Sequence, residues 1–105
     1  MNVYLGIDVG TTGIKALAVD RSGRVAGNFS HPLELLTPHP AWAEQDPERW
    51  WEGVMTILRS IPSDLRVERI GLSGQMHTLV PLDKNGRVIR NAILWCDQRT
   101  SPECE

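Results

Sequence analysis

The stretch Gly6-Ile7-Asp8-Val9-Gly10-Thr11-Thr12-Gly13-Ile14-Lys15-Ala16-Leu17 organises the N-terminal half of the chain. An apolar run from Val3 to Ile7 leads into it, and apolar residues continue from its end toward Val19. Two short apolar segments joined by a turn rich in glycine and threonine are typical of a β-hairpin. The sequence therefore predicts two antiparallel strands whose connecting turn is unusually polar.

The turn of this hairpin has the composition of a phosphate-binding loop. Gly10 and Gly13 can adopt positive φ angles and let a ligand approach the backbone closely. Consecutive N–H groups in such a turn form a concave site for phosphate oxygens, and Thr11 and Thr12 add hydroxyl donors. The same residues also fit an ordinary hairpin loop, so the turn alone does not decide between the two interpretations.

Two charged residues flank the turn. Asp8 stands at the tip of a buried strand, where its carboxylate can hold a metal-bound water or face a transferring phosphoryl group. Lys15 places a cation just beyond the turn. The alternative is that Asp8 bonds its own turn, as aspartates commonly do, and that Lys15 is a solvated charge on an edge strand.

The length of 105 residues limits the chain to one domain at most. Its residues are 41% hydrophobic, and its formal net charge is -2. No basic stripe indicates a nucleic-acid partner, and no long apolar segment indicates a membrane partner. The N-terminus enters a predicted strand without the features of a signal peptide, so we expect a cytoplasmic protein. Cys96 and Cys104 lack zinc-site spacing, and we expect both to be free thiols.

Outward from the hairpin, the chain is predicted to continue as a meander and then a loop. A tight turn at residues 20–23 separates the second strand from a third at residues 24–30, which gives three antiparallel strands. Residues 32–47 are proline-rich and show no period, so we expect an ordered surface loop. Trp42 lies in this loop and is a candidate for stacking on a ligand.

A helix is predicted to follow the loop. Asp46 caps the free N–H groups at its start, and Pro47 is tolerated at the first helical position, while Pro62 ends the helix. Apolar residues at three- and four-residue steps predict one buried face, made of Trp51, Val54, Met55 and Leu58. We expect both Trp50 and Trp51 to pack in the core, because paired aromatic residues at helical spacing usually do.

The segment after the helix is predicted to add further strands. Residues 67–73 are short, apolar and reached through a helix, which is typical of a parallel strand. This strand ends at the corner Gly74-Gln75-Met76-His77. Residues 78–82 and 87–89 then predict a hairpin around the turn at residues 83–86.

The C-terminal part is predicted to hold one more strand, at residues 92–95, followed by Cys96-Asp97-Gln98-Arg99. Residues 101–105 are predicted to begin a helix. The expected order is β-β-β-α-β-β-β, a mixed sheet of the α/β class in which polar residues follow the strand ends. Ligand sites gather at the carboxyl ends of strands in open α/β sheets.

Four segments of the chain, taken in order, resemble the N-terminal part of the FGGY carbohydrate kinase family, and among its members those that act on D-xylulose. The resemblance covers essentially the whole chain, and four motifs in order are far more specific than any one of them. These segments are Gly6 to Lys15, Trp42 to Pro47 with Trp50 and Trp51, Gly74 to His77, and Ile93 to Arg99.

The resemblance implies a ribonuclease-H-like domain of the actin and hexokinase ATPase type, with ATP and a sugar bound in a cleft between two such domains. Residues 1–105 are then an incomplete N-terminal domain without the second lobe. The implied reaction is the ATP- and Mg²⁺-dependent phosphorylation of D-xylulose to D-xylulose 5-phosphate by the full-length protein. The family's catalytic base lies in a later segment, so we expect these residues alone to be inactive.

The resemblance also assigns roles to individual residues. Asp8 is expected to act in catalysis and to hold the metal. The ATP phosphates are expected to contact Gly10, Thr11, Thr12, Gly13 and Lys15. The sugar is expected to contact Gln75, Met76, His77, Asp97 and Arg99. Two alternatives remain: His77 could be a satisfied histidine at a sheet edge, and Asp97 and Arg99 could form a surface ion pair of little energetic value.

Other functions remain compatible with the sequence. A different FGGY sugar kinase, for instance one for gluconate, would share the corner at Met76 and His77. A non-catalytic nucleotide- or sugar-binding module on the same fold is a second alternative, since function depends on the site rather than on the scaffold. Uncovered sheet edges would make the isolated chain marginally stable or self-associating, which includes a homodimer.

Overall fold

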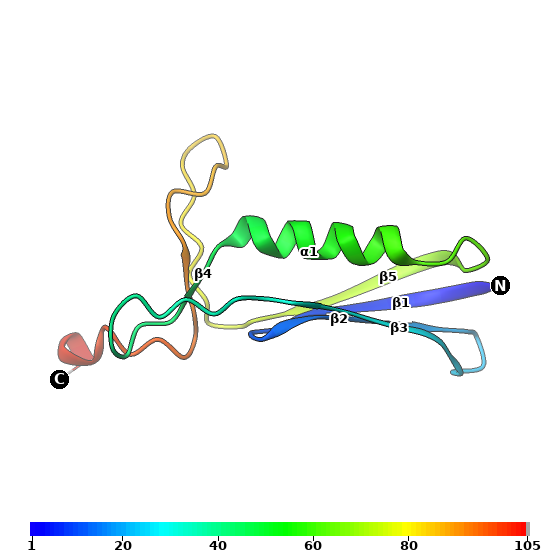
Figure 1. Ribbon diagram of the computed structural model, residues 1–105. Coiled ribbons are helices and arrows are strands. Elements are labelled where there is room, and N and C mark those ends of the chain that lie inside the picture. Colours follow the sequence, from blue (N-terminus) through cyan, green and yellow to red (C-terminus); the bar gives the residue numbers. More distant parts are fainter. Residues whose placement is uncertain (105) are drawn as a thin grey trace.

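Strands and one long helix form the body of the chain (Figure 1). The computed structural model describes residues 1–104. Their elements are β1 (Asn2–Val9), β2 (Gly13–Val19), β3 (Val25–Pro32), β4 (Glu44–Gln45), α1 (Pro47–Ser60), β5 (Arg66–Gly74), β6 (Ala92–Ile93) and the 3-10 helix η1 (Ser101–Cys104). The larger sheet has the strand order β3-β2-β1-β5, and β4 pairs with β6 in a small second sheet.

The pairing of the larger sheet confirms the predicted meander and the predicted parallel strand. β1 pairs antiparallel with β2, and β2 pairs antiparallel with β3. β5 returns beside β1 in the parallel direction after the chain has passed through α1. A parallel neighbour requires such a crossover, which the helix supplies.

The core lies between α1 and one face of the sheet. Alternate residues of β1 and β2 are buried there together with Ile57 of the helix; they are Val3, Leu5, Ile7, Ile14, Ala16 and Ala18. Gly53 lets the helix come this close, because a Cβ at that position would lie 2.6 Å from Cδ1 of Ile14. The intervening residues, such as Tyr4 and Leu17, are exposed on the opposite face.

The helix begins and ends as predicted. The Asp46 side chain accepts a hydrogen bond from the N–H of Glu48 at 3.0 Å, and Pro47 occupies the first turn. The last helical residue is Ser60, ahead of Pro62. Across residues 1–104, no helix combines the length and the apolar character that crossing a membrane requires.

The two adjacent tryptophans of α1 have different environments. Trp50 packs against a second apolar cluster around Ala43, Ala92 and Leu94, as predicted. The predicted burial of Trp51 is wrong, because this residue is 64% exposed. The buried side of the helix instead runs through Gly53 and Ile57, where the glycine permits contact with the sheet.

The region after β5 contains less regular structure than predicted. Residues 78–82 and 87–89 do not form strands; they contribute the isolated bridges Leu79 to Ile93 and Leu82 to Val88. The turn between them does form, closed by a hydrogen bond of 3.0 Å from Gly86 N–H to the Asp83 carbonyl oxygen. This segment projects from the body as an arm (Figure 1), so too few neighbouring strands are present to extend its pairing.

The predicted elements are also corrected at three further places. The loop at residues 32–47 contains β4, which pairs with β6. The last strand is shortened to Ala92–Ile93. The C-terminal helix is a 3-10 helix at Ser101–Cys104, and Glu105 lies outside the described residues. Cys96 and Cys104 are free thiols, as predicted.

Candidate functional site

The turn between β1 and β2 is closed by a hydrogen bond of 3.0 Å from Gly10 N–H to the Gly13 carbonyl oxygen. The positive φ expected at these glycines is not observed; among the described residues, the glycines with positive φ are Gly23 and Gly86. Close packing explains the glycines instead. A Cβ at Gly13 would lie 2.9 Å from the His31 carbonyl oxygen, and one at Gly10 would lie 3.1 Å from Gly13.

The tip of the turn offers donors to a ligand. In the part of the chain that the structure describes, the N–H groups of Thr11 and Thr12 make no hydrogen bond to another backbone group. The carbonyl oxygen of Thr12 is held by the N–H of Leu33 at 3.1 Å, which fixes the turn against the end of β3. Two neighbouring N–H groups on a fixed turn are suited to an anion.

Asp8 and Lys15 lie opposite each other on β1 and β2, on the sheet face away from α1. They line a hollow of about 600 Å³, which we call the open-face hollow. Gly6 and Gly71 pair in its floor, and a Cβ on either would meet no atom within 4 Å. The hydroxyl of Ser73 donates a hydrogen bond of 2.8 Å to Oδ1 of Asp8. No pattern of residues in the sequence indicates this orienting contact.

The donor set around Asp8 fits one way of binding a metal. Within residues 1–104, no group of three or more His, Cys, Asp or Glu side chains is placed to hold an ion. Mg²⁺ in nucleotide sites is commonly held by one or two carboxylates, with water and phosphate oxygens as the other ligands. Asp8 fits this mode and does not belong to an all-protein metal cage.

The predicted sugar corner forms a second hollow at the ends of β1 and β5. It has a volume of about 340 Å³, and we call it the corner hollow. Its lining comprises Gly10, Thr11, Gly74, Gln75, Met76, His77 and Trp95. The turn and the corner, which are distant in sequence, are therefore brought together. Gln75 joins them, because its Nε2 donates to the Gly10 carbonyl oxygen at 3.2 Å.

Two features of the corner bear on the role of His77. His77 has a φ of 57°, in the left-handed region that residues other than glycine seldom occupy. Met76 is 77% exposed although it is apolar. Backbone strain of this kind clusters at ligand-binding sites. The combination favours a binding role for His77 over that of a satisfied histidine at a sheet edge.

Trp95 is a wall of the corner hollow that the sequence analysis did not identify. Its side chain is 57% exposed overall. Its indole Nε1 donates a hydrogen bond of 3.0 Å to the hydroxyl of Thr11. The pattern that could have identified Trp95 is its position directly after Leu94, where a short segment with buried Ala92 and Leu94 ends.

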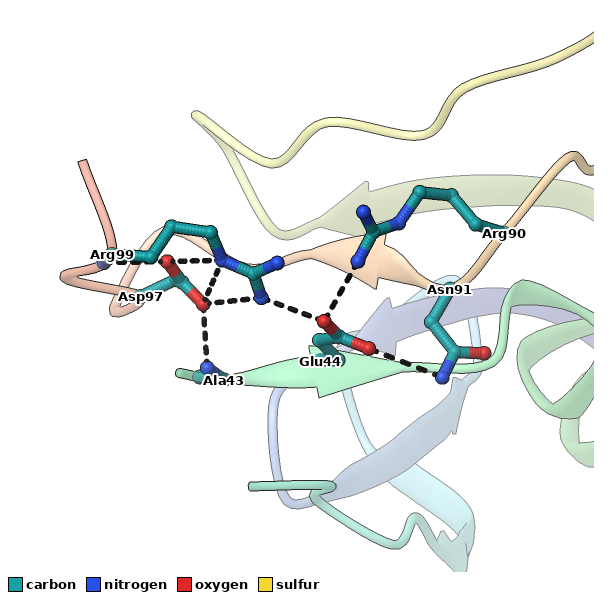
Figure 2. Close-up of polar contacts among 6 residues, drawn as sticks. All are labelled: Ala43, Glu44, Arg90, Asn91, Asp97 and Arg99. Atoms are coloured by element: carbon teal, nitrogen blue, oxygen red, sulfur yellow. Dashed lines mark hydrogen bonds and ion pairs between the residues drawn. The ribbon is translucent and has the colours of Figure 1, made fainter. Parts of the chain in front are cut away.

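Asp97 and Arg99 lie outside the lining of the corner hollow, in a buried ion cluster (Figure 2). Arg99 contacts oxygens of both Asp97 and Glu44 at 2.7 Å, and these three side chains are 12%, 3% and 7% exposed. Arg90 and Asn91 add further contacts to Glu44. The two residues do pair with each other, as in the alternative to sugar binding, but the pair is buried and does not lie at the surface.

The cluster keeps its carboxylates ionised. Hydrogen bonds from Arg99 hold the pKa of Asp97 far below its usual range, even though burial acts in the opposite direction. Burial is the largest influence on Glu44 and raises its pKa, but hydrogen bonds from Arg99 and Asn91 and the nearby positive charges outweigh it. The net pKa of Glu44 is therefore also lowered. Arg99 also stacks over the ring of Trp42, with Cζ 3.8 Å from the ring centroid.

Solved structures that align with this chain include sugar kinases. A xylulose kinase from Rhodospirillum rubrum aligns with a TM-score of 0.91 at 35% identity, over 96% of this chain and 22% of that chain. A gluconate kinase from Lactobacillus acidophilus aligns with a TM-score of 0.88 at 27% identity, over 97% of this chain and 21% of that chain. The fold is that of the N-terminal domain of actin- and hexokinase-like sugar kinases, as predicted.

Residues 3–105 match the N-terminal domain of the FGGY family of carbohydrate kinases. The chain belongs to this family. A xylulose kinase from Klebsiella pneumoniae is 42% identical over 106 residues, which cover 98% of this chain. The chain spans 22% of the length of that curated relative.

Proposed function

We propose that the full-length protein transfers a phosphoryl group from ATP to the 5-hydroxyl of D-xylulose and releases D-xylulose 5-phosphate. The observation that carries this proposal is the position of the Gly10–Gly13 turn. Gly10 and Thr11 border the corner hollow, while Asp8 and Lys15, on the strands that the turn joins, line the open-face hollow. Phosphoryl transfer needs donor and acceptor held in line, and one turn between two hollows suits that requirement.

On the nucleotide side, the free N–H groups of Thr11 and Thr12 and the hydroxyl of Thr12 bind phosphate oxygens, with Gly10 and Gly13 keeping the turn tight. Lys15 adds a positive charge from β2. Asp8, oriented by Ser73, holds Mg²⁺ through its carboxylate. A Mg²⁺ ion held there would supply positive charge to offset the negative charge of the phosphate groups. The glycines in the floor of the open-face hollow have no side chains, which leaves room there for phosphate groups and a metal ion.

On the sugar side, Gln75, Met76 and His77 contact D-xylulose, and Trp95 forms one wall of its pocket. Small-molecule sites combine apolar walls with a few placed polar groups, and this lining has both. Asp97 and Arg99 act on the site indirectly, by fixing the loop that carries Trp95, because their polar atoms are already engaged within the ion cluster.

The residue that accepts the proton of the sugar hydroxyl lies, in this proposal, outside residues 1–105. A second lobe completes the cleft, so these residues bind ligands without turning them over. We also place the protein in the cytoplasm, where the two free thiols would remain reduced. The exposed Ile70 and Leu72 on β5 leave room for contact with a further segment or with a second copy in a homodimer.

A kinase for gluconate is a second candidate, favoured by the fold of the gluconate kinase described above. The deciding experiment is a substrate panel with the full-length protein, ATP and Mg²⁺, in which kcat/KM for D-xylulose and gluconate are compared beside an Asp8→Asn variant. We expect D-xylulose to be preferred by about a hundredfold or more and Asp8→Asn to be nearly inactive. A preference for gluconate would overturn the substrate. If no sugar is phosphorylated, the remaining interpretation is a non-catalytic binding module.

A further inference from the structure

Gln45 of β4 is a buried polar residue that the proposed mechanism does not use. It is 1% exposed, yet both ends of its side-chain amide are hydrogen-bonded. Oε1 accepts from the indole Nε1 of Trp50 at 2.9 Å and from Nε2 of Gln75 at 3.0 Å. Nε2 donates to the carbonyl oxygen of Thr11.

The chemistry of the neighbours fixes the orientation of this amide. An indole N–H can only donate and a backbone carbonyl can only accept. The oxygen of Gln45 must therefore face Trp50, and its nitrogen must face Thr11. A carboxylate at this position would set an oxygen against the Thr11 carbonyl oxygen, so the site requires an amide and not merely a polar group of the same size.

The partners of Gln45 belong to both sides of the candidate site. Thr11 stands in the turn, and its hydroxyl donates to Oε1 of Gln75 at 3.3 Å. Gln75 stands in the sugar corner and also reaches the Gly10 carbonyl oxygen at 3.2 Å. Trp95 extends the same chain through its hydrogen bond to the Thr11 hydroxyl. Buried networks in which every member is satisfied hold one geometry rigidly.

We propose that Gln45 is a positioning residue that holds the phosphate turn and the sugar corner in register, with Trp50 as its anchor in α1. The role rests on the proposed function, since register matters when a phosphoryl group must pass from one side to the other. Gln45 touches neither ligand. Its loss therefore lowers kcat, while the KM values for sugar and ATP change little.

The test is Gln45→Glu in the full-length protein, with Gln98→Glu as a matched control at an exposed position. At about pH 8 we expect kcat of Gln45→Glu to fall by up to about a hundredfold, because misalignment of reacting groups by about 1 Å has that effect. Lowering the pH toward about 6 restores part of the activity relative to wild type. Burial raises the pKa of the introduced carboxyl, and its protonated form can donate to Thr11.

The contradicting result is a Gln45→Glu protein that melts at a lower temperature but keeps the kcat of wild type per folded molecule. An equal loss in Gln98→Glu would also overturn the proposal, because it would show a general effect of charge. If Gln45→Glu does not fold, Trp50→Phe removes the anchor alone and is expected to lower kcat about threefold to tenfold with unchanged KM values; an unchanged kcat contradicts the proposal.

If the wild-type protein has no kinase activity, the proposed function is overturned. The link between the turn and the corner is then tested by a separate measurement. The indole N–H resonances of Trp50 and Trp95, assigned with single Trp→Phe variants, report on the two ends of the network. Gln45→Glu is expected to shift both resonances. A shift confined to Trp50 would contradict a continuous connection between the two sides.

Discussion

Glu44 and Gln45 are neighbours on a strand of two residues, yet they build two different polar clusters. Successive side chains of a strand point to opposite faces. Glu44 enters the ion cluster with Arg90, Asn91 and Arg99 (Figure 2). Gln45 enters a neutral network with Thr11, Trp50 and Gln75. One short element thus anchors a charged cluster on one side and an uncharged one on the other.

The difference shows how the two sides serve the site. The charged cluster ties β4 to the loop after β6, since Asp97 also accepts a hydrogen bond of 2.7 Å from the N–H of Ala43. It joins these two segments and borders neither hollow. The neutral network borders the corner hollow and holds Thr11 of the turn, where a buried negative charge would oppose the binding of phosphate. Breaking the charged cluster should mainly lower stability, and altering the neutral network should mainly lower activity.

The largest effect is expected from Arg99→Met, measured as the free energy of unfolding of the full-length protein. The substitution leaves Glu44 and Asp97 buried without their shared partner. Removing one member of a buried ion pair typically destabilises a protein by about 3–5 kcal/mol. Arg49→Met is the matched control, because its pair with Glu52 is exposed and should contribute nothing measurable. Equal stabilities of the two variants would show that the cluster is not a scaffold.

The second prediction separates the clusters by pH. The folded-state pKa values of Asp97 and Glu44 are both lowered. Their contribution to stability is therefore present above the unfolded pKa values near about 4 and is lost as the pH falls. We expect the free energy of unfolding to fall below about pH 5, and less steeply in Asp97→Asn than in wild type. Parallel curves in acid denaturation would contradict the assignment.

A smaller effect is expected when Trp50→Phe and Trp51→Phe are compared by denaturant unfolding. The first variant removes the indole donor to Gln45 and should cost about 1 kcal/mol. The second changes an exposed ring without a described partner in the core and should leave stability within about 0.5 kcal/mol of wild type. The two changes are chemically identical, so a larger loss of stability in Trp51→Phe than in Trp50→Phe would contradict the role of Trp50 as the anchor.

Local signals in the sequence predicted the local structure. The hairpin at residues 6–17, the meander, the Asp46 cap and the parallel β5 all depend on residues close together in the chain or on the burial pattern of one element. The two-residue strand β4 left no such signal, because it forms by pairing with β6, which is distant in sequence. The burial of Trp51 was mispredicted for a related reason, since Gly53 decides which side of α1 meets the sheet.

The candidate site could be predicted only in part. Strand ends carrying Gly10, Thr11 and Gln75 indicated where polar groups would gather, and the structure brings them together. The contacts of Ser73 with Asp8 and of Trp95 with Thr11 cross between elements, so residue spacing does not reveal them. The composition of the turn identified its glycines correctly but not their reason, which is close packing rather than positive φ.

We propose that the turn and the corner are the phosphate and sugar sides of one site. The most direct measurement is calorimetric titration of full-length wild type and His77→Ala with D-xylulose and, separately, with ATP and Mg²⁺. His39→Ala, at an exposed position outside both hollows, is the control. The account predicts that His77→Ala weakens sugar binding about tenfold or more and leaves nucleotide affinity unchanged. Unchanged sugar affinity, or an equal loss for both ligands, would contradict it.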